Sequence, residues 1–188
     1  MNNNRLIKIS KYLSKHLRHQ PERIGIKLAV GGWVAVDELL EACRKNKFPV
    51  TRTDLEEVVA ENDKKRFSFD STGTRIRANQ GHSVKVDLQL LPSVPPDVLY
   101  HGTGHKTVEI IMENGLSKMS RHHVHLSFDI ATAKKVGARH GKAVVFEIDA
   151  AAMYEAGFVF YCSDNGIWLT DNVPAEYLKR WGDGVMGR

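Results

Sequence analysis

The chain of 188 residues has few cysteines, few prolines and no long apolar run. Its two cysteines, Cys43 and Cys162, lie far apart and form no Cys-x-x-Cys pair, which predicts reduced thiols that serve in packing. No apolar run approaches the roughly 20 residues that a membrane span needs, and residues 1–10 lack the apolar core of a secretory signal. We therefore expect a cytoplasmic globular protein.

Basic residues are unevenly distributed along the chain. Residues 1–94 contain 17 Lys and Arg against 11 Asp and Glu, whereas residues 95–188 contain 10 against 11. A basic half indicates a polyanionic partner, nucleic acid above all, because Lys and Arg neutralise phosphates and release counterions. A solvated basic surface is the alternative explanation.

The first half is predicted to form three helices and then a β-hairpin. Apolar residues at helical spacing mark the helices: Leu6, Ile9, Leu13 and Leu17 before Pro21; then Val36, Leu39, Leu40 and Cys43; then Leu55, Val58 and Val59. The third helix should open at Thr53, with Glu56 completing a capping box. Alternating residues on both sides of the turn at 70–73 predict the hairpin. This order is that of a winged helix, although purely structural domains share it.

The proline-rich stretch at 91–96 predicts a linker between two domains, because it cannot continue a helix or a central strand. After it, short apolar strands alternate with short helices. Strands are expected at 98–100, 124–126, 143–148, 158–161 and 167–169, and helices at 131–136 and before Gly115.

Two cofactor motifs fail at the glycine-containing residues 102–107. Gly102 and Gly104 begin a dinucleotide fingerprint, but Thr107 stands where its third glycine belongs, and the Gly-Lys-Ser/Thr ending of a P-loop is missing. The glycines still predict a turn after a strand, in which backbone N–H groups approach a phosphate or a ribose.

Six of the nine histidines lie in the second half, which raises the question of a metal site. His101 and His105 are separated by two glycines, so no helix holds them on one face, and no acidic or Cys ligand is clustered nearby. We expect no metal. His125 should be a partly buried strand residue with Val124 and Leu126 facing the other way.

Arg18 and His19 stand where the first helix must end, before Pro21. An Arg offers a bidentate fork for phosphate and a His offers a proton donor near neutral pH, so the pair suits phosphate chemistry. Simple complementarity with the helix C-terminal dipole is the alternative explanation, and the spacing of the two residues alone favours it. Arg66 and Arg121 are individually no more specific.

Six segments in order closely resemble the RNA 2′-phosphotransferases of the KptA/Tpt type. They are Leu-Ser-Lys-His-Leu-Arg-His at 13–19, Lys-Arg-Phe at 65–67, Ile-Arg-Ala-Asn-Gln-Gly-His-Ser at 76–83, Tyr-His-Gly-Thr at 100–103, Arg-His-His-Val-His-Leu-Ser at 121–127 and Asp-Asn-Gly-Ile-Trp-Leu-Thr at 164–170. The resemblance spans nearly the whole chain. It implies an α+β protein with a winged-helix RNA lobe at 1–91 and an ADP-ribosyltransferase-like NAD-binding lobe at 92–188.

The resemblance also implies a reaction. An internal RNA 2′-phosphate attacks C1″ of the nicotinamide ribose of NAD, and the resulting RNA-2′-phospho-ADP-ribose releases 2′-OH RNA and ADP-ribose 1″,2″-cyclic phosphate. The implied partner is RNA that carries such a phosphate, with no metal and no obligatory protein partner. The implied catalytic set is Arg18, His19, Arg66 and Arg121, with His19 as general acid. The implied NAD-binding set is His101, Gly102, Thr103, His125, Leu126, Ser127 and Arg139.

Two other functions remain open from the residues. One is a winged-helix regulator that senses NAD without turnover, and the other is an ADP-ribosyltransferase that leaves a stable mark on a nucleic-acid end or a protein. If the resemblance holds, the active site should lie in a cleft between the two lobes, and neither half should be active alone.

Overall fold

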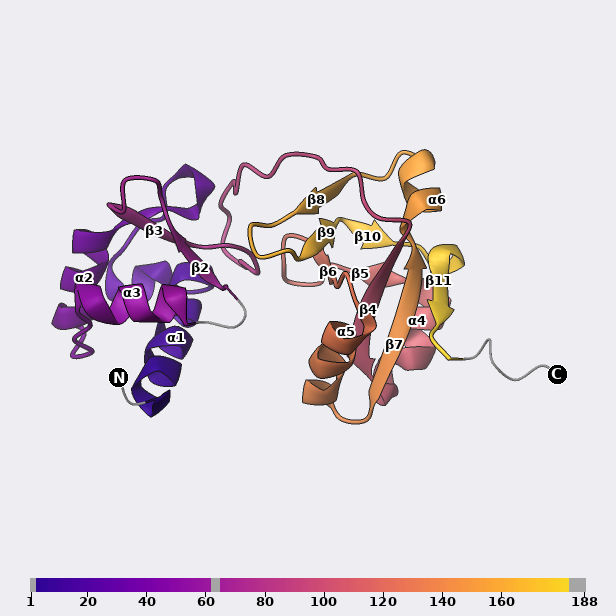
Figure 1. Ribbon diagram of the computed structural model, residues 1–188, viewed down its shortest axis with the longest axis horizontal. Coiled ribbons are helices and arrows are strands. Elements are labelled where there is room, and N and C mark those ends of the chain that lie inside the picture. Colours follow the sequence, from indigo (N-terminus) through magenta and orange to yellow (C-terminus); the bar gives the residue numbers. More distant parts are fainter. Residues whose placement is uncertain (1–2, 62–64, 183–188) are drawn as a thin grey trace. The chain divides into compact units, whose positions relative to one another are not determined.

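A computed structural model of the chain describes residues 3–61 and 65–182. The chain folds into two compact units, which divide between Gln89 and Leu90 (Figure 1). Both units combine helices with small antiparallel sheets, which confirms the mixed α+β class. No helix in the described ranges is long and apolar enough to cross a membrane.

Unit 1 contains the predicted three helices followed by a hairpin. Its elements are α1 (Asn3–Arg18), β1 (Val34–Ala35), α2 (Val36–Lys45), α3 (Arg52–Ala60), β2 (Phe67–Phe69) and β3 (Arg75–Ala78). The strands form one antiparallel sheet in the order β1-β3-β2. The apolar positions that marked the helices form the core, where Leu13, Leu17, Leu39 and Leu55 are fully buried. The short strand β1 carries no sequence signal because it has only two residues.

The start of α3 differs from the prediction. Thr51, not Thr53, is the N-cap, and its hydroxyl accepts a hydrogen bond from the Asp54 backbone N–H at 3.1 Å. The Asp54 carboxylate in turn accepts a hydrogen bond from the Thr51 backbone N–H at 2.9 Å, so Asp54 replaces Glu56 in the capping box. Arg5 of α1 donates to the same carboxylate at 2.8 Å, which ties α1 to the N-terminus of α3.

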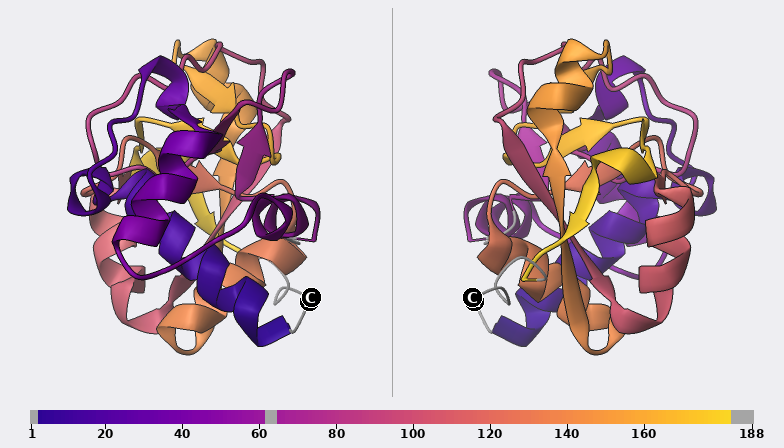
Figure 2. Two further views of the ribbon diagram at one scale, coloured as in Figure 1. Left: turned by 90° about the vertical axis from the view of Figure 1, so that its left-hand side faces the viewer. Right: turned by 90° about the vertical axis from the view of Figure 1, so that its right-hand side faces the viewer.

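Unit 2 is built from short strands and helices. Its elements are β4 (Val98–Gly104), α4 (Val108–Asn114), β5 (Leu116–Ser117), β6 (Val124–Leu126), α5 (Ile130–Gly137), β7 (Ala143–Asp149), α6 (Ala150–Glu155), β8 (Phe160–Cys162), β9 (Trp168–Thr170), β10 (Asn172–Val173) and β11 (Leu178–Arg180). The strands form sheets in the orders β11-β7-β4, β6-β9-β8 and β10-β5. The long β4–β7 pair and the α5 helix beside it are labelled in Figure 1, and the orange strand β7 is visible again in the right-hand view of Figure 2.

Several sequence-based boundaries in unit 2 are shifted. Phe158 and Val159 precede β8 rather than belonging to it, and Ile167 precedes β9. Met112 of α4 is 45% exposed, so it does not belong to the buried face of its helix. Both cysteines are free thiols, as expected, but only Cys43 is buried in the core and Cys162 is exposed.

Candidate active site

The C-terminal end of α1 is held by a segment far away in the sequence. The Arg18 carbonyl, one of the orphan acceptors of the last helical turn, accepts a hydrogen bond from the Ser83 backbone N–H at 2.9 Å. The Ser83 hydroxyl lies 2.9 Å from Nδ1 of His19, whose side chain is exposed. The partly buried Arg18 guanidinium lies 5.9 Å from the centre of the Phe67 ring.

Arg66 reaches the same part of unit 1 through its backbone. It directly precedes β2, and its carbonyl accepts a hydrogen bond from the Asn79 backbone N–H at 2.9 Å. The buried Asn79 side chain donates to the carbonyl of Lys65 at 2.7 Å, so both residues before β2 are fixed. Since Phe67 contacts Arg18 and follows Arg66, the structure brings Arg18, His19 and Arg66 into one region.

In unit 2, three predicted site residues form a connected chain. Nδ1 of His101, on β4, donates to the backbone carbonyl of His125, on β6, at 3.1 Å. The guanidinium of Arg121 lies 3.3 Å from Nδ1 of His125 and donates to it. Tyr100 and Ser127 exchange two backbone hydrogen bonds of 2.9 and 2.7 Å, which fix the two segments side by side.

The protonation of His101 is set by this environment. Burial lowers the pKa of its imidazole below the ordinary value, and electrostatic interaction with Arg121 and His140 lowers it further, against an opposing effect of the hydrogen bond to His125. His101 is therefore neutral near pH 7. Because Nδ1 carries the proton that reaches the His125 carbonyl, Nε2 carries a lone pair. Such an atom suits a ribose hydroxyl, which needs an acceptor.

The predicted glycine turn is wrong, because β4 continues through Gly104. Gly102 packs so closely against α5 that a Cβ there would overlap the backbone carbonyl of Ala133, and at Gly104 it would overlap the carbonyl of His140. Close approach of strand and helix backbones therefore explains both glycines. The signal that sequence reasoning attributed to a ligand has a packing cause here.

The other predicted NAD-binding residues have unequal access to a ligand. The Thr103 hydroxyl lies 2.7 Å from that of Thr107, and because Thr107 donates its proton to the Gly104 carbonyl at 3.0 Å, Thr103 is the donor of the pair. Leu126 is 1% exposed and belongs to the core, so it has little access to a ligand. Ser127 is buried, and Arg139 is exposed in the single turn Ala138–His140.

The described part of the chain contains no candidate metal site. No group of three His, Cys, Asp or Glu residues is placed there so that it could hold an ion. His123 instead contacts the ring of Tyr161, with ring centres 5.3 Å apart.

Comparison with known proteins identifies the family to which these residues belong. Residues 4–172 match the family model described as "RNA 2'-phosphotransferase, Tpt1 / KptA family". The chain belongs to this family. It is 74% identical to a probable RNA 2'-phosphotransferase of Nostoc punctiforme over 96% of this chain and 99% of that one. It is 68% identical to that of Trichormus variabilis, covering 93% of this chain and 96% of the other. It is 55% identical to a probable RNA 2'-phosphotransferase of Herpetosiphon aurantiacus, covering 95% of this chain and 98% of the other.

The matched range of this RNA 2′-phosphotransferase family includes two residues to which sequence reasoning gave no role. Asn79 holds the residues before β2 and Ser83 holds His19, both from one short segment without helix or strand. Their signal was present in the Asn-Gln-Gly-His-Ser run at 79–83, where polar residues follow directly after a strand. The sequence did not show which partners they would hold, because each bond spans a long sequence separation.

Proposed function

We propose that this RNA 2′-phosphotransferase removes an internal 2′-phosphate from RNA by transferring it to NAD. The observation that carries the proposal is the chain from Arg121 through His125 to His101. Transfer of a phosphate to a ribose requires an anion-binding group and a hydroxyl-binding group side by side. Arg121 offers the first, neutral His101 offers the second, and His125 joins them.

The proposed reaction has two steps. In the first, an RNA 2′-phosphate oxygen bonds to C1″ of the nicotinamide ribose, and the bond to nicotinamide breaks. In the second, ribose O2″ bonds to the phosphorus and the bond to RNA O2′ breaks, which leaves 2′-OH RNA and ADP-ribose 1″,2″-cyclic phosphate. Charge develops on the non-bridging phosphate oxygens and on the departing O2′ during the second step.

Each proposed catalytic side chain meets one of these demands. Arg18, Arg66 and Arg121 bind the non-bridging oxygens, because a guanidinium pairs with phosphate through two parallel hydrogen bonds. His19 protonates the departing O2′ through Nε2, while Nδ1 stays on Ser83.

The NAD-binding part of the proposal rests on the donors and acceptors of unit 2. His101 would accept a hydrogen bond from a ribose hydroxyl, and the exposed Arg139 would pair with the pyrophosphate. Gly102, Thr103, Leu126 and Ser127 would border the NAD site. Residues 92–188 would then form the ADP-ribosyltransferase-like lobe.

Residues 1–91 would form a winged-helix lobe that holds RNA. Three helices followed by an antiparallel hairpin support this part of the proposal. On β3, the guanidinium carbons of Arg75 and Arg77 lie 5.5 and 4.6 Å from the centre of the Trp33 ring, which gathers two cations around one aromatic side chain.

A single reaction tests the proposal. The protein is incubated with NAD and an oligoribonucleotide that carries one internal 2′-phosphate, and the RNA and nucleotide products are separated. We expect 2′-OH RNA together with ADP-ribose 1″,2″-cyclic phosphate. A stable ADP-ribosylated RNA would instead indicate a transferase that stops after the first step, and unchanged RNA would indicate an NAD sensor.

A variant separates the two steps. His19→Ala should slow the second step more than the first, so that the RNA-linked ADP-ribose accumulates. Equal slowing of both steps would contradict the assignment of His19 as the general acid.

A further inference from the structure

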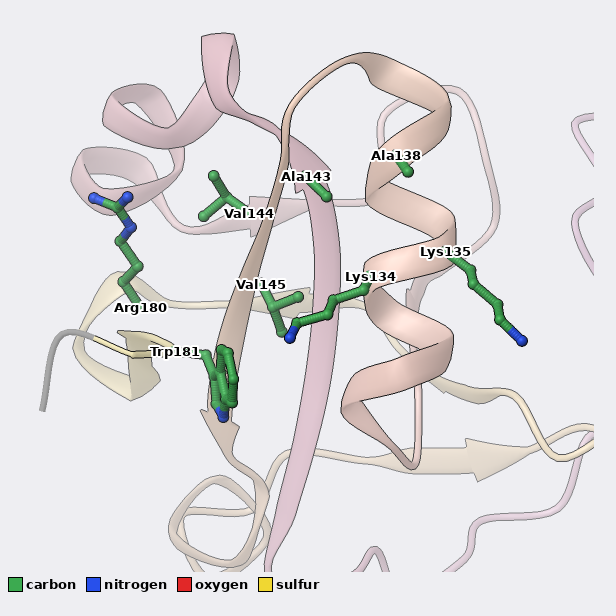
Figure 3. Close-up of a pocket in the computed structure, with 8 residues that line it drawn as sticks. All are labelled: Lys134, Lys135, Ala138, Ala143, Val144, Val145, Arg180 and Trp181. Carbon is green, nitrogen blue, oxygen red and sulfur yellow. The ribbon is translucent and has the colours of Figure 1, made fainter. Parts of the chain in front are cut away.

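A hollow of about 500 Å³ lies at one edge of unit 2, beside α5 and where the chain leaves β11. Its walls include Val144 and Val145 of β7, three cationic side chains and the indole of Trp181 (Figure 3). Its volume falls within the range of about 300–1,000 Å³ that is typical of small-molecule sites. We call it the basic hollow.

Trp181 provides the basic hollow with an aromatic face on a backbone that is fixed to β7. Its backbone N–H donates to the carbonyl of Val145 at 2.9 Å, which continues the β7–β11 pairing by one residue. The side chain nevertheless remains 40% exposed. The ammonium of Lys134 lies 4.2 Å from the ring centre, so a cation already accompanies the indole.

The charge of the basic hollow is of one sign. Lys134, Lys135 and Arg180 line it, and none of the described residues that line it is acidic. Figure 3 shows Lys134 extending toward Trp181, with Lys135 and Arg180 pointing out to either side. Three cations around an apolar floor favour a ligand that has both an anionic and a flat apolar part.

The opposite end of the β7–β11 pair carries the opposite charge. A second hollow there has a volume of about 360 Å³. Its lining includes one cation, Lys179, and four acidic residues, which are Asp97, Glu147, Asp149 and Glu176. The near-neutral charge of the second half therefore conceals two separated patches. A polyanion would be repelled from the acidic end and attracted to the basic one.

We propose that the basic hollow binds one nucleotide of the RNA strand, with its base stacked on Trp181 and the strand on either side of it attracted to Lys135 and Arg180, which point outward. Single-stranded RNA is typically bound in this way, by bases stacked on aromatic side chains and cations along the backbone. The inference rests on RNA as the substrate, which the proposed function shares.

The bound nucleotide lies several positions along the strand from the reacting phosphate. In the sheet β11-β7-β4, the hollow lies at β7 and β11, whereas His101 lies on β4. The basic hollow therefore extends the contact with RNA beyond the Arg121–His125–His101 chain. It would make the enzyme favour an RNA strand over a short 2′-phosphorylated fragment.

The test compares two single-stranded RNAs of about 4 and 12 nucleotides with the same central sequence and one internal 2′-phosphate, labelled for fluorescence anisotropy. Trp181→Ala should weaken binding of the longer RNA about tenfold and leave binding of the shorter RNA unchanged, because only the longer RNA reaches Trp181. Trp181→Phe should restore most of the affinity, since it restores an aromatic face.

Charge variants test the phosphate contacts without touching the core. Lys135→Ala should weaken binding of the longer RNA about threefold. It should also reduce the slope of the logarithm of the binding constant against the logarithm of the salt concentration by about one in magnitude. Lys179→Ala removes the same charge at the acidic hollow and should change neither. Thermal unfolding of each variant verifies that the fold is retained.

The outcomes distinguish this inference from the proposed function. Normal binding of the longer RNA by Trp181→Ala and Lys135→Ala would overturn the inference while leaving the reaction intact. If AMP at equal concentration displaces neither RNA, binding of an RNA nucleotide in the basic hollow is supported. If instead AMP binding depends on Trp181 and RNA binding does not, the basic hollow is a site for free nucleotides. Absence of NAD-dependent turnover by the wild-type protein would contradict only the proposed function, because binding is measured without NAD.

Discussion

His19 and Ser83 are separated by 64 residues in the sequence, yet the Ser83 hydroxyl lies 2.9 Å from Nδ1 of His19. The backbone of Ser83 holds the same helix end through its hydrogen bond to the Arg18 carbonyl. A hydroxyl can accept a hydrogen bond from protonated Nδ1 and donate one to unprotonated Nδ1. Ser83 can therefore orient the ring throughout a proton transfer at Nε2.

Removal of the Ser83 hydroxyl should slow the reaction without abolishing it. One hydrogen bond contributes about 1 kcal/mol net, so Ser83→Ala should lower kcat about five- to tenfold. The substitution His19→Ala should cost more, about 100-fold or above, because it removes the proposed acid itself. Single-turnover kinetics with a 2′-phosphorylated RNA measure both effects.

The conservative variant Ser83→Thr provides the control. It keeps the hydroxyl, so its pH–rate profile should match that of the wild-type protein, whereas Ser83→Ala should shift the limb that reports His19. If Ser83→Ala and Ser83→Thr were equally slow with unchanged profiles, Ser83 would have a packing role only.

The capping box of α3 predicts a contrast between two threonines that are two residues apart. Thr51→Ala removes the side-chain acceptor of the Asp54 N–H and should lower the free energy of unfolding by about 1 kcal/mol. Thr53→Ala, in the exposed first turn, should be neutral or slightly stabilising because Ala has the higher helix propensity. Urea denaturation measures the free energy of unfolding of both variants. A larger loss of stability in Thr53→Ala than in Thr51→Ala would support Thr53 as the N-cap, as the sequence predicted.

The same contrast illustrates how far the sequence predicts this fold. Apolar spacing predicted all three helices of unit 1, because burial of Leu13, Leu39 and Leu55 dominates their placement. It misplaced the cap, because Thr51 and Thr53 both offer a hydroxyl followed three residues later by a carboxylate. Arg5 of α1 contacts the carboxylate of Asp54, and this tertiary contact is absent from local sequence.

The candidate site shows a comparable division. The resemblance indicated the candidate catalytic residues, and the structure brings Arg18, His19 and Arg66 into one region of unit 1. The resemblance could not indicate that Asn79 and Ser83 hold this region, because hydrogen bonds between residues far apart in the sequence follow from the fold. At Gly102 the predicted turn is wrong for a different reason: a glycine indicates that something approaches the backbone closely, but not that this something is the backbone of α5.

Gly102 therefore allows a test that separates packing from ligand binding. In Gly102→Ala the new Cβ overlaps the Ala133 carbonyl, so β4 and α5 must separate and the melting temperature of the ligand-free protein should fall by several degrees. Gly157→Ala introduces a methyl group with nothing within 4 Å, at a positive φ, and measures the cost of the backbone alone. A Gly102→Ala protein with normal stability and weak NAD binding would instead support the sequence-based interpretation of a ligand-contacting glycine.

The neutral state of His101 predicts how the protein responds to acid. Burial lowers the pKa of His101, so below about pH 6.5 the unfolded chain binds more protons at this residue than the folded chain does. The stability that His101 contributes is thus present above about pH 6.5 and is lost as the pH falls through its lowered pKa. Urea denaturation between about pH 7.5 and 5.5 should show a smaller loss of stability for His101→Gln than for the wild-type protein.

The matched control for this titration is His123→Gln. Burial lowers the pKa of His123 as well, so this variant should also lose less stability in acid. It should not alter the pH dependence of the KM for NAD, because His123 contacts Tyr161 and not the His101 chain. In the wild-type protein that KM should rise as the pH falls, since a protonated Nε2 no longer accepts a ribose hydroxyl. A KM that is independent of pH across the titration of His101 would remove His101 from the NAD site.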